Sequence, residues 1–166
     1  YKQLLAIEKT NVMQSIATES LTESGELQNY LDKIRTSSFD LFKRGKSEEA
    51  IALIQKEIIE KKYAKDNDFS ALGDIYLFNK QFVKAEELYK KAIDKNSSEL
   101  LYQLKLAHVF MFSNKVGEAK AIHKLYKDNN VSSSKSWIAQ TKFDFEDFEK
   151  RGFPTDNFKK ILRILD

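Results

Sequence analysis

The hydrophobic and polar positions between residues 66 and 99 follow the pattern of two amphipathic helices. The first apolar stripe has the i, i+3, i+4, i+7 spacing of one helix face, and polar residues at 79–81 interrupt it. The stripes are Phe69, Leu72, Gly73 and Tyr76, and then Phe82, Ala85, Leu88, Tyr89, Ala92 and Ile93. The pattern predicts two helices joined by a short turn.

Small residues stand where these two predicted helices would cross. Gly73 lies in the first helix and Ala85 in the second. Glycine inside a helix costs about 1 kcal/mol relative to alanine, so Gly73 indicates a close approach of the two helices. Asn67 and Asp68 are suited to cap the first helix, and the polar residues 96–98 are expected to end the pair.

The same pattern returns at a step of 34 or 35 residues. Equivalent small residues are Ser38, Gly73 and Ala107 in the first helices, and Ala50, Ala85 and Ala119 in the second helices; at the next step Gln140 and Thr141 replace the Leu-Gly pair. Units of this length cannot bury an apolar face alone, and three of them are the usual minimum for a stable stack. The spacing therefore predicts stacked helical hairpins over residues 21–131.

The N-terminal end departs from this pattern. Residues 1–20 are expected to form a separate helix or linker, because their apolar positions are helical in spacing but do not match the repeat. Small and polar residues at 19–25 are expected to break this helix from the next one. The helix would pack on or cap the repeats, or alternatively link them to an upstream domain or dock in the protein's own groove.

The C-terminal end, residues 132–166, is expected to form a modified pair of capping helices. A serine-rich cap at 131–134 precedes a helix that begins near Trp137, and Gly152 is expected to end that helix. A last helix is expected to be capped by Thr155 or Asp156. End units of helical stacks depart from the repeat because one of their faces meets water.

The spacing and residue types resemble those of the tetratricopeptide repeat. The family pattern is aromatic-x2-Leu-Gly-x2-Tyr and then Ala-x3-aromatic, found here as Phe69-x2-Leu72-Gly73-x2-Tyr76 followed by Ala85-x3-Tyr89. Ser97 stands where the family has its terminating proline. The resemblance, which covers residues 31–130, implies an all-α fold: an α-α superhelix of about three repeats, with an extra N-terminal helix and C-terminal capping helices.

In this family the first helices of the pairs line a concave groove that binds peptides, so the resemblance implies a protein or peptide partner. Projection of the repeat onto the sequence gives a largely apolar groove lined by Phe39, Phe42, Asp74, Leu77, Phe78, Leu101, Leu104, Lys105, His108, Met111 and Phe112. This projection does not separate groove positions from the core between repeats. Apolar patches of this size are normally covered by a partner or by the protein itself.

Two functions are consistent with this surface. We expect a non-catalytic scaffold that binds a protein or peptide in the groove. The alternative is a structural or oligomerisation module of a larger protein, whose groove is filled by its own N-terminal helix or by a second copy in a homodimer. The two functions differ in what covers Phe78, Leu104, Met111 and Phe112.

The sequence contains no recognisable set of catalytic or metal-binding residues. The two histidines, His108 and His123, lie 15 residues apart, and no ligand motif of standard spacing surrounds them. His123 is expected to be a core histidine, whereas His108 could be a polar group in the groove. We therefore expect no enzymatic activity, no cofactor and no metal.

Composition narrows the classes of partner. The 28 basic and 25 acidic residues are interspersed along the predicted helices, which argues against nucleic-acid binding. No apolar run approaches the ~18 residues that span a membrane, so no membrane insertion is expected. The chain has no cysteine, which permits any redox compartment. It begins at Tyr1, as a fragment or processed form would, so the location stays open: cytoplasmic, or periplasmic or secreted if an upstream signal was removed.

Overall fold

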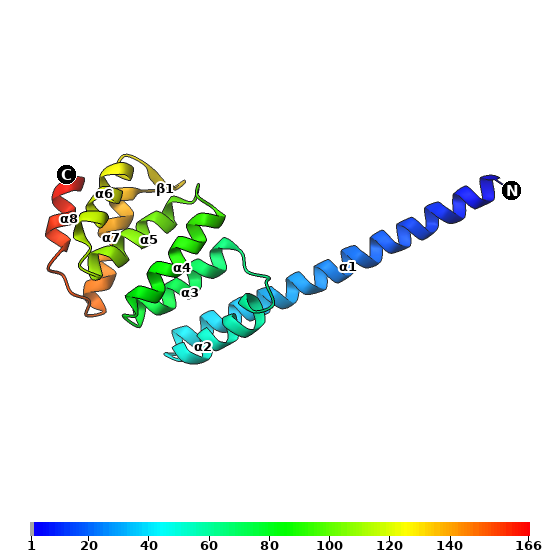
Figure 1. The fold of residues 1–166 in the computed structure, drawn as a ribbon, viewed down its shortest axis with the longest axis horizontal. Coiled ribbons are helices and arrows are strands. Elements are labelled where there is room, and N and C mark those ends of the chain that lie inside the picture. The colour runs from blue at the N-terminus through cyan, green and yellow to red at the C-terminus, as the bar shows by residue number, and fades with distance from the viewer. Residues whose placement is uncertain (1) are drawn as a thin grey trace. The chain divides into compact units, whose positions relative to one another are not determined.

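A computed structural model describes the backbone of residues 2–166 and the side chains of residues 23–166 (Figure 1). The described chain is 74% helical, which confirms the all-α prediction. Its elements are α1 (Lys2–Lys43), α2 (Ser47–Ile54), a π-helix (Gln55–Ile59), α3 (Asp66–Phe78), α4 (Phe82–Lys95), α5 (Leu100–Phe112), α6 (Val116–Tyr126), β1 (Asn130–Ser132), β2 (Lys135–Ser136), α7 (Trp137–Lys150) and α8 (Phe158–Leu165).

The chain divides into two compact units. Unit 1 comprises residues 1–61 and unit 2 comprises residues 62–166. Helices that follow one another in sequence pack together from α1 to α2 in unit 1 and from α3 to α6 in unit 2, and α8 packs on α6. The architecture is thus built mainly from local contacts.

Unit 1 is a helical hairpin made by α1, α2 and the π-helix. The buried residues of this hairpin include Leu31 and Ser38 from α1, and Ala50, Ile54 and Ile58 from α2 and the π-helix. The Tyr30 hydroxyl donates a hydrogen bond to the Glu57 carboxylate at 2.6 Å, which ties α1 to the π-helix. The expected packing role of residues 1–20 lies outside the described side chains.

The expected helix break at residues 19–25 is wrong, because α1 runs without interruption through this stretch. Serine, threonine and a single glycine weaken a helix by at most about 1 kcal/mol each and leave its hydrogen bonds intact, whereas proline would break it. A Cβ atom placed on Gly25 would meet nothing within 4 Å, so this glycine serves no close contact. Helix α1 ends at Lys43 instead, and Gly45 just beyond it has a left-handed φ of +77°.

The turns of the three helical hairpins, α1–α2, α3–α4 and α5–α6, share one geometry. Each has a left-handed residue, at Gly45, Lys80 and Asn114, with φ of 77°, 58° and 61°. The next residue is Lys46, Gln81 or Lys115, with φ/ψ of −94°/57°, −92°/67° and −89°/55°. The amide of that residue donates to the carbonyl five residues earlier, at 2.9, 2.8 and 2.8 Å. The predicted turn at 79–81 is therefore confirmed.

Unit 2 ends in a modified helix pair. Residues 130–136 form a short β-hairpin, so the expected serine-rich cap at 131–134 is wrong. The residue that caps α7 is Ser136, whose hydroxyl accepts a hydrogen bond from the Ala139 amide at 3.1 Å. Gly152, with φ of +70°, ends α7 as predicted. The last helix, α8, begins at Phe158, and its N-cap position is Asn157 instead of Thr155 or Asp156.

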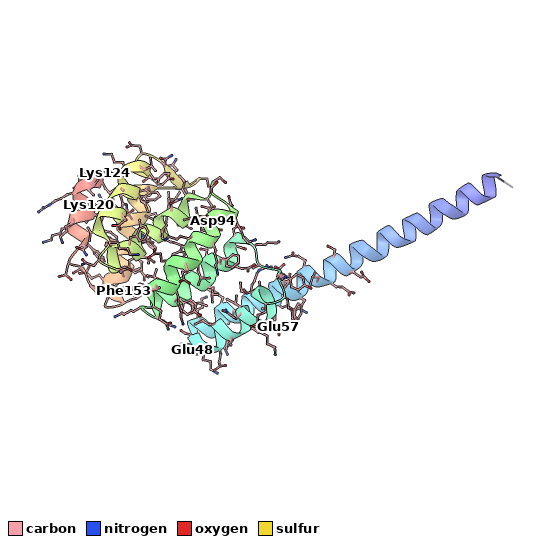
Figure 2. The ribbon with its side chains drawn as sticks, viewed as in Figure 1. Glu48, Glu57, Asp94, Lys120, Lys124 and Phe153 are labelled. Carbon is pink, nitrogen blue, oxygen red and sulfur yellow. The ribbon has the colours of Figure 1, made fainter. Side chains whose placement is uncertain are left out.

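The hydrophobic core of unit 2 lies between the hairpins and the C-terminal helices. Its fully buried side chains include Tyr89, Leu104, Met111, Trp137 and Ile161. Figure 2 shows that charged side chains such as Asp94 and Lys124 lie on the outside of this unit. Among the described residues, no helix is both long enough and apolar enough to cross a membrane.

Candidate functional site

Four of the residues predicted to line an open groove are buried. Leu77, Leu104, His108 and Met111 are 3%, 0%, 1% and 1% exposed. The prediction that these four side chains face a partner is therefore wrong, because their positions belong to the core of unit 2. A binding role for the predicted groove as a whole stays a prediction.

Aromatic side chains from the C-terminal segment cover this apolar face. The ring of Phe112 lies 5.0 Å from that of Phe148 in α7 and 4.9 Å from that of Phe153. Phe78 lies 6.1 Å from Phe148, measured between ring centroids. In the next layer, Phe145 stacks on Phe158 of α8 at 4.1 Å. The covering residues come from 145–158, which the sequence had indicated only as a separate cap.

The other predicted residues keep part of their surface. Asp74, Leu101 and Lys105 are partly exposed in unit 2. In unit 1, Phe42 is partly exposed and Phe39 is 55% exposed, with the Lys43 ammonium 4.3 Å from the Phe39 ring centroid. Phe78 and Phe112 of unit 2 are also partly exposed, so the accessible residues of the prediction in this unit are both polar and apolar.

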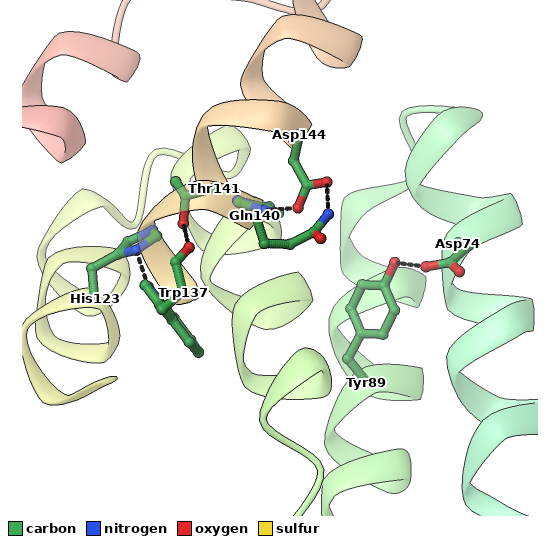
Figure 3. A network of polar contacts seen from close by, with 8 residues as sticks. Asp74, Tyr89, His123, Trp137, Gln140, Thr141 and Asp144 are labelled. Carbon is green, nitrogen blue, oxygen red and sulfur yellow. Dashed lines mark hydrogen bonds and ion pairs between the residues drawn. The ribbon is translucent and has the colours of Figure 1, made fainter. Parts of the chain in front are cut away.

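A polar cluster joins α3, α4 and α5, and Figure 3 shows its hydrogen bond between Tyr89 and Asp74. The Lys105 ammonium donates to the Asp74 carboxylate at 2.7 Å and to the Ser70 hydroxyl at 2.9 Å. The buried Tyr89 hydroxyl donates to the other Asp74 oxygen at 2.7 Å. Burial, and then the Asp74 charge, raise the pKa of Tyr89 well above its usual value. Asp74 is thus held in one orientation from two helices.

The close approach predicted at Gly73 is made to Tyr89. A Cβ atom at Gly73 would lie 2.7 and 2.9 Å from two atoms of the Tyr89 ring. Glycine at this position therefore lets the ring lie close against α3 and brings the Tyr89 hydroxyl to Asp74.

A second polar cluster joins α5 and α7. His108 Nε2 lies 3.0 Å from one oxygen of Asp144, and the Gln140 amide donates to the other oxygen at 2.7 Å. The Asp144 side chain is 21% exposed, while that of His108 is 2% exposed. Asp144 and Gln140 were missing from the predicted site, because no spacing rule in the sequence pairs them with His108.

His123 is a core histidine, as predicted. It is completely buried, and its Nδ1 accepts a hydrogen bond from the Trp137 indole at 2.9 Å. Burial, and secondly the neighbouring His108, lower the pKa of His123 to about 3. The Trp137 partner could not be inferred from the sequence, since no spacing rule pairs these two side chains.

The two clusters are suited to hydrogen bonding and charge pairing. The partly exposed groups Asp74, Lys105, Gln140 and Asp144 come from α3, α5 and α7, the first helices of consecutive pairs. Among residues 23–166, no group of three or more histidine, aspartate or glutamate side chains could hold a metal ion. The expectation of no catalysis stays a prediction.

Comparison of the chain with known proteins found no matching family model, no similar curated protein and no similar solved structure.

Proposed function

We propose that this chain is a non-catalytic interaction scaffold of the tetratricopeptide type, which binds a protein or peptide segment across the first helices of its hairpins. The binding surface would be centred on Asp74 and Lys105, with Leu101, Gln140 and Asp144 around them. No residue of this proposal requires a cofactor or a metal.

The observation that carries the proposal is the recurring turn. Three turns share their left-handed residue, their φ/ψ values and their hydrogen bond, at steps of 35 and 34 residues. Repetition of one turn at one step is what a chain of equivalent helical hairpins would produce. A fourth such turn, at Gly152, has the corresponding bond from the Phe153 amide to the Phe148 carbonyl at 2.9 Å.

Burial of the small residues supports the same interpretation. The small residues of the first helices are all buried, and those of the second helices are 0% exposed. These residues are Ser38, Gly73, Ala107 and Thr141, and then Ala50, Ala85 and Ala119. Equivalent burial at equivalent positions is expected when the same helix crossing recurs.

The chemistry of the surface favours a peptide. Asp74 and Lys105 are fixed by their mutual contact and by Tyr89 and Ser70, so they would lose little freedom when a partner binds. Their remaining hydrogen-bonding capacity suits the amide groups of an extended chain, and Leu101 adds an apolar contact. This surface replaces the apolar groove expected from the sequence, whose floor is buried.

The burial of that floor also favours a second candidate, a structural module of a larger protein. Phe112, one of the residues of the expected groove, is in ring contact with Phe148, Phe153 and Phe158 of the same unit. A domain that fills its own groove in this way would serve as a spacer or assembly element instead of a receptor.

Selection from a random peptide library on the full chain would separate the two candidates. The binding constant of a selected peptide would then be measured by fluorescence anisotropy on wild type, Lys105→Met and Lys124→Met, the last as a control at an exposed lysine of α6. A scaffold predicts micromolar binding that Lys105→Met weakens at least tenfold and Lys124→Met leaves unchanged. Failure to select any peptide, or equal affinity for all three proteins, would favour the structural module.

A further inference from the structure

Two buried imidazole rings face each other across the α5–α6 contact. The ring centroids of His108 and His123 are 6.2 Å apart. Each ring has one nitrogen in a hydrogen bond and one buried nitrogen without a partner, Nδ1 in His108 and Nε2 in His123. Buried polar atoms are nearly always paired, so these two nitrogens require an explanation.

The bonded partners fix where the protons lie. The Trp137 indole can only donate, so Nδ1 of His123 must carry a lone pair, and the proton of the neutral ring is on Nε2. The Asp144 carboxylate can only accept, so Nε2 of His108 carries a proton. With His108 neutral, its Nδ1 is an acceptor. The two unpartnered atoms are therefore a donor on His123 and an acceptor on His108.

We propose that these groups form a one-directional hydrogen-bond relay from Trp137 through His123 and His108 to Asp144, closed by one internal water between the rings, and that it holds α7 against α5 and α6 only while His123 is neutral. One water would accept from His123 Nε2 and donate to His108 Nδ1, which satisfies both nitrogens. All donors then point toward Asp144, and bonds aligned in this way strengthen one another.

Other charged and titratable groups surround the relay. Asp144 comes from α7 and His123 from α6, while Lys105 shares α5 with His108. The negative charges of Asp144 and of Asp74, which belongs to α3, both raise the pKa of Tyr89 in α4. Among the side chains of residues 23–166, the negative charge in contact with His108 is that of Asp144, while Phe145 and Phe148 make ring contacts at 5.6 and 5.3 Å.

Protonation of His123 would break the pattern. A proton on His123 Nδ1 would face the Trp137 N–H, so that two donors would oppose each other. The lowered pKa of His123, about 3, agrees with this. Because its pKa is lower in the folded state than in the unfolded state, its contribution to stability is complete above about pH 6.5 and is lost as the pH falls toward 3.

Histidine-selective ¹H–¹⁵N correlation spectra of the full chain at pH 7.5 test the relay directly. The relay predicts that both rings are neutral and carry their proton on Nε2. A proton on Nδ1 of either ring, or a charged ring at this pH, would overturn it. The measurement needs no mutation, so a folding defect cannot obscure the result.

A variant separates a relay from simple packing. Trp137→Phe removes the donor to His123 but keeps an aromatic ring at the site. The relay predicts that the variant's His123 exchanges between its two tautomers and titrates at a higher pH than in wild type. An unchanged tautomer and titration would show that packing alone sets the state of His123.

Unfolding experiments between pH 7.0 and 5.5 measure how the free energy of unfolding depends on pH. The chain has two histidines, and carboxyl groups ordinarily titrate below this window. Below about pH 6.5, keeping His123 neutral in the folded state makes unfolding up to tenfold more favourable per pH unit. The relay predicts this loss in wild type and a nearly flat profile in His108→Gln/His123→Gln. An equally steep profile in both proteins would contradict the proposal.

Discussion

The most informative substitution is at the close contact between Gly73 and Tyr89. Gly73→Ala would place a Cβ atom 2.7 Å from Cε1 and 2.9 Å from Cδ1 of the Tyr89 ring. Carbon atoms normally pack about 3.5–4.0 Å apart, so one of the two residues must move. Tyr89 is completely buried and its hydroxyl is bonded to Asp74 at 2.7 Å, so a shift of the ring would strain that bond.

The magnitude follows from two opposing effects. Overpacking of this kind costs roughly 1–3 kcal/mol, whereas alanine gains about 0.5–1 kcal/mol over glycine inside a helix. We expect a net loss of about 1–2 kcal/mol in the free energy of unfolding. Gly117→Ala is the matched control, since a Cβ atom there would meet nothing within 4 Å, and it should stabilise by up to about 1 kcal/mol.

Urea unfolding followed by tryptophan fluorescence would measure both variants. The single tryptophan, Trp137, lies in the core of unit 2 and therefore reports on the unit that contains both glycines. With a slope of about 2 kcal/mol per molar urea, the urea concentrations at which the two variants are half unfolded should differ by about 1 M. If Gly73→Ala stabilised the protein as much as Gly117→Ala, the tight crossing of α3 and α4 would be refuted.

Three further substitutions test local structure, two of them in the core of unit 2 and one in α1 of unit 1. Tyr89→Phe should lower the free energy of unfolding by about 1 kcal/mol in the same urea assay, because it removes a buried hydrogen bond to Asp74. Leu104→Ala should lower it by about 2–5 kcal/mol, since Leu104 is 0% exposed; a loss below about 1 kcal/mol would mean that Leu104 faces solvent after all. Gly25→Ala should stabilise α1 by up to about 1 kcal/mol and raise the far-UV circular dichroism signal of a helix, whereas a loss of helix would indicate a contact at Gly25.

The hairpins of residues 66–126 could be predicted because local rules decide them. The apolar stripes place the four helices, and the polar turn at 79–81 and the small residues at 73 and 85 specify how the first pair meets. Two of the left-handed turn residues, Lys80 and Asn114, escaped prediction. Lysine has no preference for that conformation, so it gives no sequence signal there.

The candidate site was predictable only in part, because burial depends on segments far away in sequence. The repeat frame identifies the helix face on which Leu104 and Met111 lie, but not that Phe148, Phe153 and Phe158 would come to cover it. Helix α7 also runs past the repeat length, since its terminating Gly152 follows Asn114 by 38 residues. The extra turn brings Phe148 to the rings of Phe78 and Phe112, a contact that no local pattern encodes.

The helix break expected at residues 19–25 was predicted wrongly for a different reason. A cluster of serine, threonine and glycine is typical of a helix end, but termination needs a backbone that leaves the helical region, as it does at Gly45. Propensity alone was too weak an effect to decide the outcome.

Amide chemical-shift mapping is the most direct test of whether a peptide or protein segment binds across the first helices of the hairpins. A library-selected peptide would be titrated into the ¹⁵N-labelled full chain. We expect the largest shifts in α3, α5 and α7, around Asp74, Lys105 and Asp144. Shifts confined to α4 and α6, or no selectable peptide at all, would contradict it.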